Sequence, residues 1–327
     1  MKAIKFFAIT AMAAAMITSC SNEDELSQSN YPSDNIIRVT AGVNNAKTRA
    51  EGAGTEMKND FSLTIVNKNA PKYTYTDKVF SKTSGDWACS ETLLWQKSDA
   101  LVDIVAFAPA QTGKFNGVYA NGSIQPIAYS VAKDQTTADD KNDLLYYYAK
   151  DFNPGESLDK GKLNIQFNHA FCMIDINVTL GTEFNKPEVL KESPIVKVTL
   201  GGTKIAANVN VTNAASVVTI SETDAATDIT TTKGSFDKAA DPEANAKSHF
   251  SCIAIPQTVG ANTFKVSLKT AGKLYEWTSD KEITLQSGYR YTLNLTMGDN
   301  VVLLKGGSIT ASPWTEGDTG DKPLETD

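Results

Sequence analysis

Apolar and polar residues alternate along much of the chain after residue 36, with the period of two that a half-buried β-strand requires. The first such segment carries its apolar side chains at Ile37, Val39, Ala41 and Val43. Residues 101–108 are instead almost continuously apolar, which is typical of a strand covered on both faces. Turn-forming pairs such as Asn121-Gly122 separate the segments, and none beyond residue 20 holds a helical period. The pattern predicts an all-β fold of antiparallel sandwiches, of Greek-key or transthyretin-like type.

The alternation changes phase at one place. Leu163, Ile165 and Phe167 occupy odd positions, whereas the apolar residues from Ala170 onward occupy even positions. A shift of one residue turns every following side chain to the other face of a sheet. The change of phase therefore predicts a β-bulge near residues 168–169.

Residues 1–19 have the three parts of an export signal. Lys2 and Lys5 precede an apolar run, and small residues then lead to Ser19 and Cys20. The run is shorter than the about twenty residues that a membrane-spanning helix needs. Residues 17–20, Ile-Thr-Ser-Cys, resemble a bacterial lipobox, which implies cleavage between Ser19 and Cys20 and lipidation of Cys20, palmitate included. The alternative is an ordinary secretory signal that ends at a chance cysteine.

Two domains are expected after this leader. Residues 20–35 are polar and predict a lipidated, flexible linker. About 280 further residues exceed what one core of ordinary size covers. The polar stretch 150–162, with its glycines and Pro154, is the predicted boundary. It divides the chain into an amino-terminal sandwich over residues 36–155 and a carboxy-terminal sandwich over residues 156–327, which ends in a short polar tail.

The charge of the chain argues against nucleic-acid binding. The net charge is −7, and loss of Lys2 and Lys5 with the leader changes it to −9. An acidic chain has no attraction for polyphosphate, and no run rich in lysine and arginine is present.

The cysteines do not form a disulfide framework. Apart from Cys20 they are Cys89, Cys172 and Cys252, an odd number. Cys172 and Cys252 lie in apolar, strand-like runs, so that either a disulfide between them or two buried free thiols fits the sequence.

No motif marks a catalytic or metal site. The two histidines, His169 and His249, are expected to pack within strands, and without an HExxH or paired CxxC motif they cannot form a usual zinc site. The acidic residues at 139–143 lack the spacing and the glycine of an EF-hand loop. Nothing marks a pair of carboxylates for glycosidase chemistry. We therefore expect a protein that is not an enzyme and needs no cofactor or metal.

Several short strings of residues follow one another through the exported chain in a characteristic order. They are IRVTAGV at 37–43, Thr48-Arg49-Ala50, Trp95 before VDIVAFAP at 102–109, DLLY at 143–146, FNHA at 167–170, SGYRY at 287–291, Ile309 and Trp314. Together they resemble the Bacteroidales fimbrillin family, the subunits of type V pili. The resemblance covers most of the chain beyond the leader.

The resemblance implies an assembly scheme. Subunits of the family are exported as lipoproteins, and a trypsin-like protease then cuts after an arginine near the first strand. Here the implied cut lies between Arg49 and Ala50, and it would release the strand that carries Ile37, Val39, Ala41 and Val43. A strand from the carboxy-terminal part of the next subunit would then fill the groove, by β-strand addition. An ordinary exposed loop arginine is the alternative for Arg49.

Two carboxy-terminal segments are candidates for the donor strand. One consists of Val301, Val302, Leu303 and Leu304, and the other of residues 308–314. The same residues could instead close the second sandwich, which leaves the position in the pilus open.

The resemblance also implies partners and a location. The partners are other fimbrillin subunits, the outer membrane through the lipid anchor, a trypsin-like processing protease, and a host protein or glycan in adhesion. The acidic cluster at 21–25 resembles the export tag of Bacteroidetes surface lipoproteins, which implies the cell outer membrane and its fimbriae. The second hypothesis is a surface glycan-binding lipoprotein that does not polymerise. It would use exposed aromatic residues such as Trp87, Trp95, Trp314 or the tyrosines at 146–148.

Overall fold

β-strands make up most of the ordered elements, so the all-β prediction is confirmed. The structure is a computed structural model, and it describes residues 30–44, 55–57, 59–185, 188–221, 223–304 and 309–314. Within these ranges the one α-helix, α1 (Pro154–Ser157), is a single turn, and no helix is long and apolar enough to cross a membrane. Short 3-10 turns occur at Pro71–Tyr73, Asn116–Val118, Asp140–Asn142 and Thr182–Asn185.

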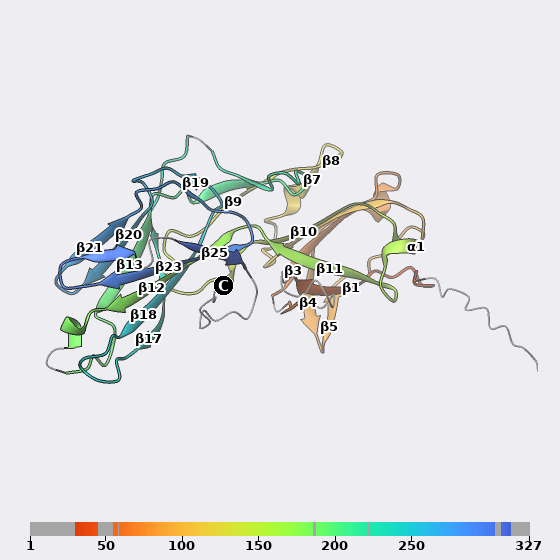
Figure 1. Cartoon of the computed structure of the whole chain (residues 1–327). Helices are drawn as coiled ribbons and strands as arrows, with labels where there is room; N and C mark the ends of the chain where they lie inside the picture. The colour runs from red at the N-terminus through yellow and green to blue at the C-terminus, as the bar shows by residue number, and fades with distance from the viewer. Residues whose placement is uncertain are drawn as a thin grey trace, which may run out of the picture.

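An eight-stranded sheet occupies one end of the elongated molecule (Figure 1). Its order is β11-β10-β6-β3-β4-β5-β1-β2, and β1 also pairs with β11, so that the ladder closes on itself. The strands are β1 (Arg38–Val43), β2 (Thr55–Glu56), β3 (Phe61–Val66), β4 (Tyr75–Thr83), β5 (Asp86–Cys89), β6 (Val102–Ala108), β10 (Leu145–Phe152) and β11 (Lys162–His169).

Two further sheets pack at the other end (Figure 1). The six-stranded sheet has the order β17-β18-β12-β23-β24, with β25 also paired to β23. Its strands are β12 (Cys172–Leu180), β17 (Thr232–Asp237), β18 (Lys247–Ala254), β23 (Tyr289–Met297), β24 (Val302–Leu304) and β25 (Thr310–Pro313). The four-stranded sheet, of order β16-β13-β20-β21, consists of β13 (Ile195–Gly201), β16 (Ile229–Thr230), β20 (Lys265–Thr270) and β21 (Leu274–Thr278).

The remaining strands form small ladders. A three-stranded sheet joins β9 (Ile127–Ser130), β14 (Ala206–Val209) and β15 (Val218–Thr219). The two-stranded ladders are β7 (Tyr119–Ala120) with β8 (Ser123–Ile124), and β19 (Thr258–Val259) with β22 (Ile283–Thr284).

Two apolar clusters fill the interior, and β6 contributes to both. Ile104 and Ala106 point into the smaller cluster, inside the eight-stranded sheet. Val105 and Phe107 point into the larger cluster, which is built mainly from residues after 170. All seven residues of β6 are buried, which confirms that its continuous apolar run reflects cover on both faces.

The chain moves between the two ends more than once. After β6, residues 111–144 join the other end: β9 pairs with β14, and Phe115 and Leu144 pack in the larger cluster. β10 and β11 then return to the eight-stranded sheet. β11 therefore lies with the amino-terminal strands, although it follows the predicted boundary at 155/156. The division into two domains stays a prediction.

The predicted β-bulge near Asn168 and His169 is wrong. β11 ends at His169, and β12 begins at Cys172 in a different sheet. Ala170 and Phe171 form the bend between them. The phase changes because the chain passes from one sheet to another, where the side of the strand that faces the core is set anew.

Cys89, Cys172 and Cys252 are free thiols. The register partner of Cys172 is Ala254, whereas that of Cys252 is Ile174, so the two buried thiols are diagonal neighbours on adjacent strands. The Cys172 thiol donates a hydrogen bond to the Ala254 carbonyl oxygen (3.2 Å). Burial raises the pKa of both thiols well above its ordinary value.

We expect an alkylating reagent at pH 8 to label Cys89, which is partly exposed, and to leave Cys172 and Cys252 unlabelled until the chain unfolds. The free energy of unfolding should also fall as the pH rises above 9.0, the ordinary thiol pKa. There the exposed thiols of the unfolded chain ionise while the buried ones stay protonated. Mass spectrometry of labelled peptides and urea titrations between pH 8 and 10.5 measure both effects. Equal labelling of the three thiols in the native chain would contradict the prediction.

A buried ion pair joins two neighbouring strands of the six-stranded sheet. The Arg290 side chain on β23 donates from Nε to the Asp175 carboxylate on β12, and both side chains are buried. Removal of one partner leaves the other charge without compensation in the interior.

The substitution Arg290→Met should therefore lower the free energy of unfolding by about 3–5 kcal/mol in urea denaturation. Arg38→Met is the matched control, because Arg38 forms an exposed ion pair with Asp34 and its loss should cost less than about 1 kcal/mol. Equal losses in the free energy of unfolding for the two substitutions would show that the buried pair contributes no more to stability than the exposed pair does.

Candidate strand-exchange site

β1 lies in the eight-stranded sheet between β5 and β11 (Figure 1). It pairs in parallel with β11 over six residues, from Arg38 opposite Lys162 to Val43 opposite Phe167. On its other side it pairs with β5 and with β2. A strand close to the start of the described chain therefore completes the closed ladder.

The side chains of this segment alternate as the sequence predicts. Ile37, Val39 and Val43 are buried in the smaller cluster, and the partly buried Ala41 packs against it. Arg38 and Thr40 between them are exposed. The four residues predicted for the displaced strand thus share the inner face of the sheet.

Polar contacts hold both ends of β1. At its start, Asp34 forms an ion pair with Arg38 (2.6 Å), and the hydrogen bond from Arg38 lowers the pKa of this carboxyl to about 2. After its end, the Asn44 backbone N–H donates to the Phe167 carbonyl oxygen (2.7 Å). The Asn44 side chain donates to the Asn168 side-chain oxygen (2.8 Å).

β11 depends on β1 for most of its backbone pairing. Within the described ranges, β10 pairs with β11 only at Asn168 and His169, whereas β1 pairs with residues 162–167. Loss of β1 would leave that stretch of β11 with unpaired backbone groups and would open the apolar cluster beside it. Such an edge is a template for another strand.

The other predicted processing residues lie outside the described residues. These are Ser19, Cys20, Arg49 and Ala50. In the sequence, Arg49 lies between β1 and β2, so a cut after it would separate β1 covalently from the rest of the chain.

Both donor candidates run along one edge of β23. β24 pairs antiparallel with residues 295–297 of β23, and β25 pairs antiparallel with residues 289–292. Val302 is buried, whereas Val301 and Leu303 are 50% and 60% exposed. In β25, three of the four side chains are exposed. Each candidate thus occupies an edge of its own subunit.

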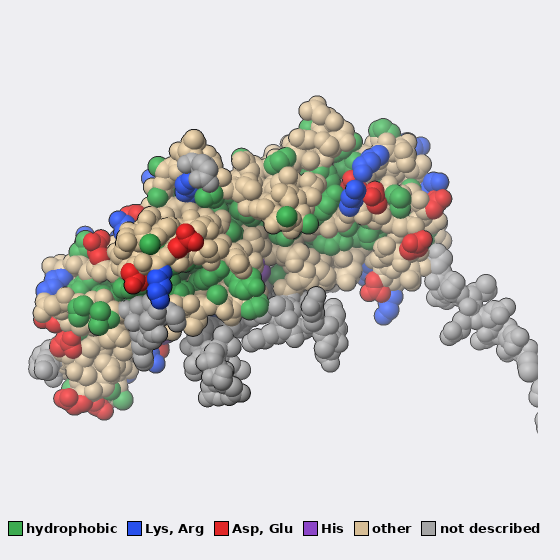
Figure 2. All heavy atoms as spheres, turned by 45° about the horizontal axis from the view of Figure 1, so that its top comes forward, with side chains coloured by type: hydrophobic (Ala, Val, Ile, Leu, Met, Phe, Trp, Pro, Cys, Tyr) green, Lys and Arg blue, Asp and Glu red, His purple; other side chains and the backbone are tan. Residues whose placement is uncertain are grey.

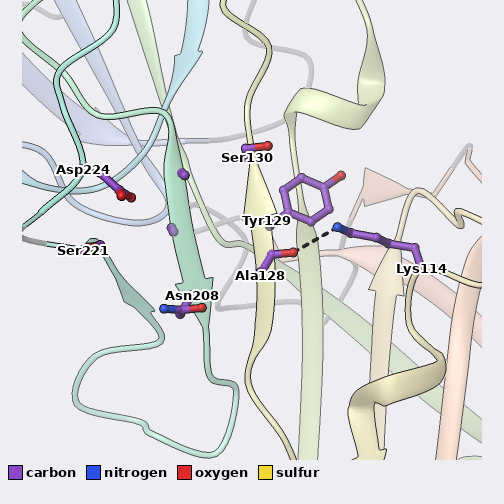
Figure 3. A pocket seen from close by; sticks show the side chains of 9 residues that line it. Lys114, Ala128, Tyr129, Ser130, Asn208, Ser221 and Asp224 are labelled. Atoms are coloured by element: carbon purple, nitrogen blue, oxygen red, sulfur yellow. Dashed lines mark hydrogen bonds between the residues drawn. The ribbon is translucent and has the colours of Figure 1, made fainter.

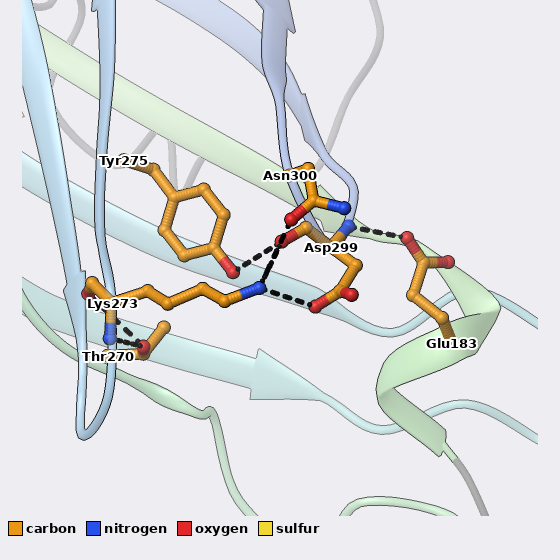
Figure 4. Close-up of polar contacts among 6 residues, drawn as sticks. All are labelled: Glu183, Thr270, Lys273, Tyr275, Asp299 and Asn300. Carbon is orange, nitrogen blue, oxygen red and sulfur yellow. Dashed lines mark hydrogen bonds and ion pairs between the residues drawn. The ribbon is translucent and has the colours of Figure 1, made fainter.

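A polar network fixes the turn between β23 and β24 (Figure 4). The Lys273 ammonium donates to the backbone and side-chain oxygens of Asp299 (2.8 and 3.1 Å) and to the Asn300 side chain (3.2 Å). The Tyr275 hydroxyl donates to the Asp299 carbonyl, and the Asp299 N–H donates to Glu183. β24 is therefore anchored at its turn, from β21 on one side and from the segment after β12 on the other.

Trp314 stacks on His169, a contact that the sequence analysis did not anticipate. The two ring centroids lie 3.8 Å apart and the planes differ by 14°. The Trp314 backbone N–H donates to the Gly288 carbonyl oxygen (2.7 Å). The Asp143 carboxylate accepts a hydrogen bond from His169 Nδ1 (3.0 Å). One place in the fold thus brings together four features of the family resemblance: the strings at 143–146, 167–170 and 287–291, and Trp314. The presence of these strings in the resemblance was the sequence signal that could have pointed to this site.

A shallow hollow of about 330 Å³ lies beside β9 and β14 (Figure 3). At its rim, Lys114 donates to the Ala128 carbonyl oxygen (3.0 Å) and lies over the Tyr129 ring. Burial raises the pKa of Tyr129 to about 12, and its hydroxyl donates a hydrogen bond to the Lys141 carbonyl oxygen (2.7 Å). Asp224 and Ser221 on the opposite side form no nucleophile–base pair with these groups in Figure 3. In the described ranges, no group of three or more potential metal ligands comes together.

The remaining surface offers no large patch of one charge on the face in Figure 2, where acidic and basic side chains are interspersed. Trp87 and Trp95, named for a possible sugar platform, are buried in the smaller cluster. The face of Trp314 that lies on His169 is covered as well.

Comparison with known proteins places the chain in a family. A family model described as fimbrillin-like matches residues 48–314. No curated protein matches the sequence.

Solved structures share the fold. A candidate cell adhesion protein from Bacteroides ovatus is 16% identical, with a TM-score of 0.60 over 85% of this chain and 96% of that one. A candidate cell adhesion protein from Bacteroides uniformis is 14% identical, with a TM-score of 0.56 over 87% of this chain and all of that one. A fimbrial protein from Bacteroides vulgatus is 16% identical, with a TM-score of 0.53 over 86% of this chain and 99% of that one. Because the family match spans most of the sequence, the chain belongs to the fimbrillin-like family.

Proposed function

We propose that this protein is a structural subunit of a cell-surface fimbria that is activated by proteolysis after Arg49 and assembled by donor-strand exchange. Family membership supports a fimbrial subunit rather than an enzyme. The observation that carries the proposal is β1: an amino-terminal strand, buried along one face, whose removal would open a groove beside β11.

The arginines favour Arg49 as the processing position. The chain contains three: Arg38, Arg49 and Arg290. Arg38 lies within the paired strand β1, and Arg290 is buried in an ion pair. A protease needs an extended, accessible backbone, which neither of these positions offers. Arg49 is the remaining arginine, and a cut after it separates the segment that contains β1 from the rest of the chain.

The open groove defines what the donor must supply. Ile37, Val39 and Val43 leave behind an apolar trough lined by side chains such as Phe61 and Phe167. An incoming strand needs alternating apolar side chains and a free backbone edge. Val302 and Leu304 of β24, or Ile309 with β25, are the candidates in the carboxy-terminal part of the next subunit.

The proposal also includes a location at the outer membrane and a division of the chain into two domains. Lipidation at Cys20 would hold the exported subunit at the outer membrane until the cut after Arg49 releases it into the fimbria. The proposal includes two sandwich domains, one around each apolar cluster, and the presence of two separate clusters supports it. A host protein or glycan is the proposed adhesion partner. The alternative of a non-polymerising glycan-binding protein gains no support from Trp87 and Trp95, which are buried.

Treatment of the exported chain with an arginine-specific protease should give one cut, after Arg49. Size exclusion and native mass spectrometry should then show the loss of the β1 fragment and a ladder of oligomers. Arg49→Ala should remain uncut and monomeric, and Arg38→Ala, the matched control, should behave like the wild type. A ladder that forms equally fast in Arg49→Ala would refute processing at this position.

Weakening β1 from its inner face should speed this release. Val39→Ala removes buried apolar volume and should lower the free energy of unfolding of the uncut chain by about 2 kcal/mol. After the cut, the Val39→Ala variant should release β1 several-fold faster than the wild type does. The release rate is measured by mass spectrometry of the freed fragment. Thr40→Ala, on the exposed face, is the control; it removes one exposed hydrogen bond to Asn164 (3.3 Å) and should lower stability by no more than about 1 kcal/mol. Equal release rates for both variants would argue that the buried face does not hold the strand.

A further inference from the structure

We propose that the stack of Trp314 on His169 is a latch, which holds β25 on its own subunit until β1 leaves. The proposal rests on the function proposed above and adds a regulation to it. It assigns a role to His169 and Asp143, which the strand-exchange scheme does not use, and to Trp314 at the end of the second donor candidate.

Beyond its backbone pairing with β23 and a hydrogen bond from the Thr310 hydroxyl to the Thr292 carbonyl oxygen (3.4 Å), the side chains of β25 itself contribute little to hold it. Thr310, Ala311 and Pro313 are exposed, and Ser312 is half-buried. Pro313 also lacks an N–H for the ladder with β23. In contrast, β24 buries Val302 and is tied down by the Lys273 network. Two side chains that flank β25 pack: Ile309, just before it, lies partly buried against the larger cluster, and Trp314, just after it, stacks on His169. The stack is therefore the contact that holds the carboxy-terminal end of β25.

His169 is held rigidly to receive this stack. Its side chain is only 3% exposed, and Asp143 fixes the ring through Nδ1 at 3.0 Å from one oxygen and 3.1 Å from the other. Among the described residues, Nε2 is buried without a hydrogen-bond partner. A buried polar atom without a partner lowers stability, so the site is not optimised for stability alone. The arrangement instead suits a flat, oriented surface for the indole ring.

The same strand connects the latch to β1. His169 is the last residue of β11, and residues 162–167 of that strand pair with β1. Asn44, directly after β1, bonds to Phe167 and Asn168, the two residues that precede His169. When β1 leaves, β11 loses these bonds and keeps two register pairs with β10. His169 is then held from one side only, by its pairing with β10 and by Asp143, so the platform under Trp314 loosens and β25 becomes free to leave the edge of β23.

Hydrogen exchange of the exported chain, read by mass spectrometry on peptides that contain β25, tests the latch. Trp314→Ala should raise exchange in β25 at least ten-fold and leave β12 and β18 unchanged. Trp314→Phe should retain much of the protection, because the ring still stacks. Thr310→Ala is the matched control: it removes an exposed side chain and its long hydrogen bond to Thr292 (3.4 Å) from the same strand, and should change the exchange of β25 much less than Trp314→Ala. Unchanged exchange of β25 in Trp314→Ala would overturn the proposal.

The coupling is tested by loss of β1 from the chain that retains Trp314. The cut after Arg49, or Val39→Asp in the uncut chain, should raise exchange in β25 by a similar factor. Oligomer formation is followed in the same samples. Exchange is read on the fraction that is still monomeric, because a β25 strand donated to a neighbour would be protected there. If that fraction has shed β1 and keeps β25 protected while the ladder forms, the latch is wrong and the proposed function stands. If β25 is released but no ladder forms, the latch stands and donor-strand exchange fails.

Discussion

The parallel pairing of β1 with β11 is the contact on which the amino-terminal half depends. It closes the eight-stranded ladder and covers the smaller apolar cluster with Ile37, Val39 and Val43. It also supplies backbone partners to residues 162–167 of β11, which β10 does not reach. Backbone groups and apolar side chains that share one partner strand are exposed together when that strand leaves. Loss of β1 from a sheet closed in this way leaves a backbone edge and an apolar trough that fit another strand with the same alternation of apolar side chains.

β11 also ties the two ends of the molecule together. Its last residue, His169, lies under Trp314, and the bend at Ala170 and Phe171 leads directly into β12 of the six-stranded sheet. Trp314 in turn is bonded to Gly288, just before β23. Three contacts therefore connect β1 to the edge of β23 that carries β24 and β25. β1 pairs with β11, His169 of β11 stacks on Trp314, and Trp314 is hydrogen-bonded to Gly288. This proximity gives a physical route by which an event at the amino terminus can reach the carboxy-terminal strands.

The predictable part of this structure is the part that period and residue type specify locally. The alternation at 37–43 placed the correct side chains inside, and the apolar run at 101–108 anticipated a strand buried on both faces. β4 and β10 were not anticipated, because tyrosine, lysine and aspartate mask their period in Tyr75–Thr83 and Leu145–Phe152. The strings of the family resemblance marked residues 143–146, 167–170 and 287–291 without showing that they meet.

The sequence by itself determined the strand character of the chain, the inward face of β1 and the absence of any familiar catalytic motif, because each depends on residues close together in the chain. The tertiary structure alone decided that the phase change after Phe167 marks a passage between sheets, that residues 111–144 pack with the far end, and that Trp314 covers His169. These features join residues up to 145 positions apart, Trp314 and His169 among them, and local periodicity carries no information about which strand edges meet.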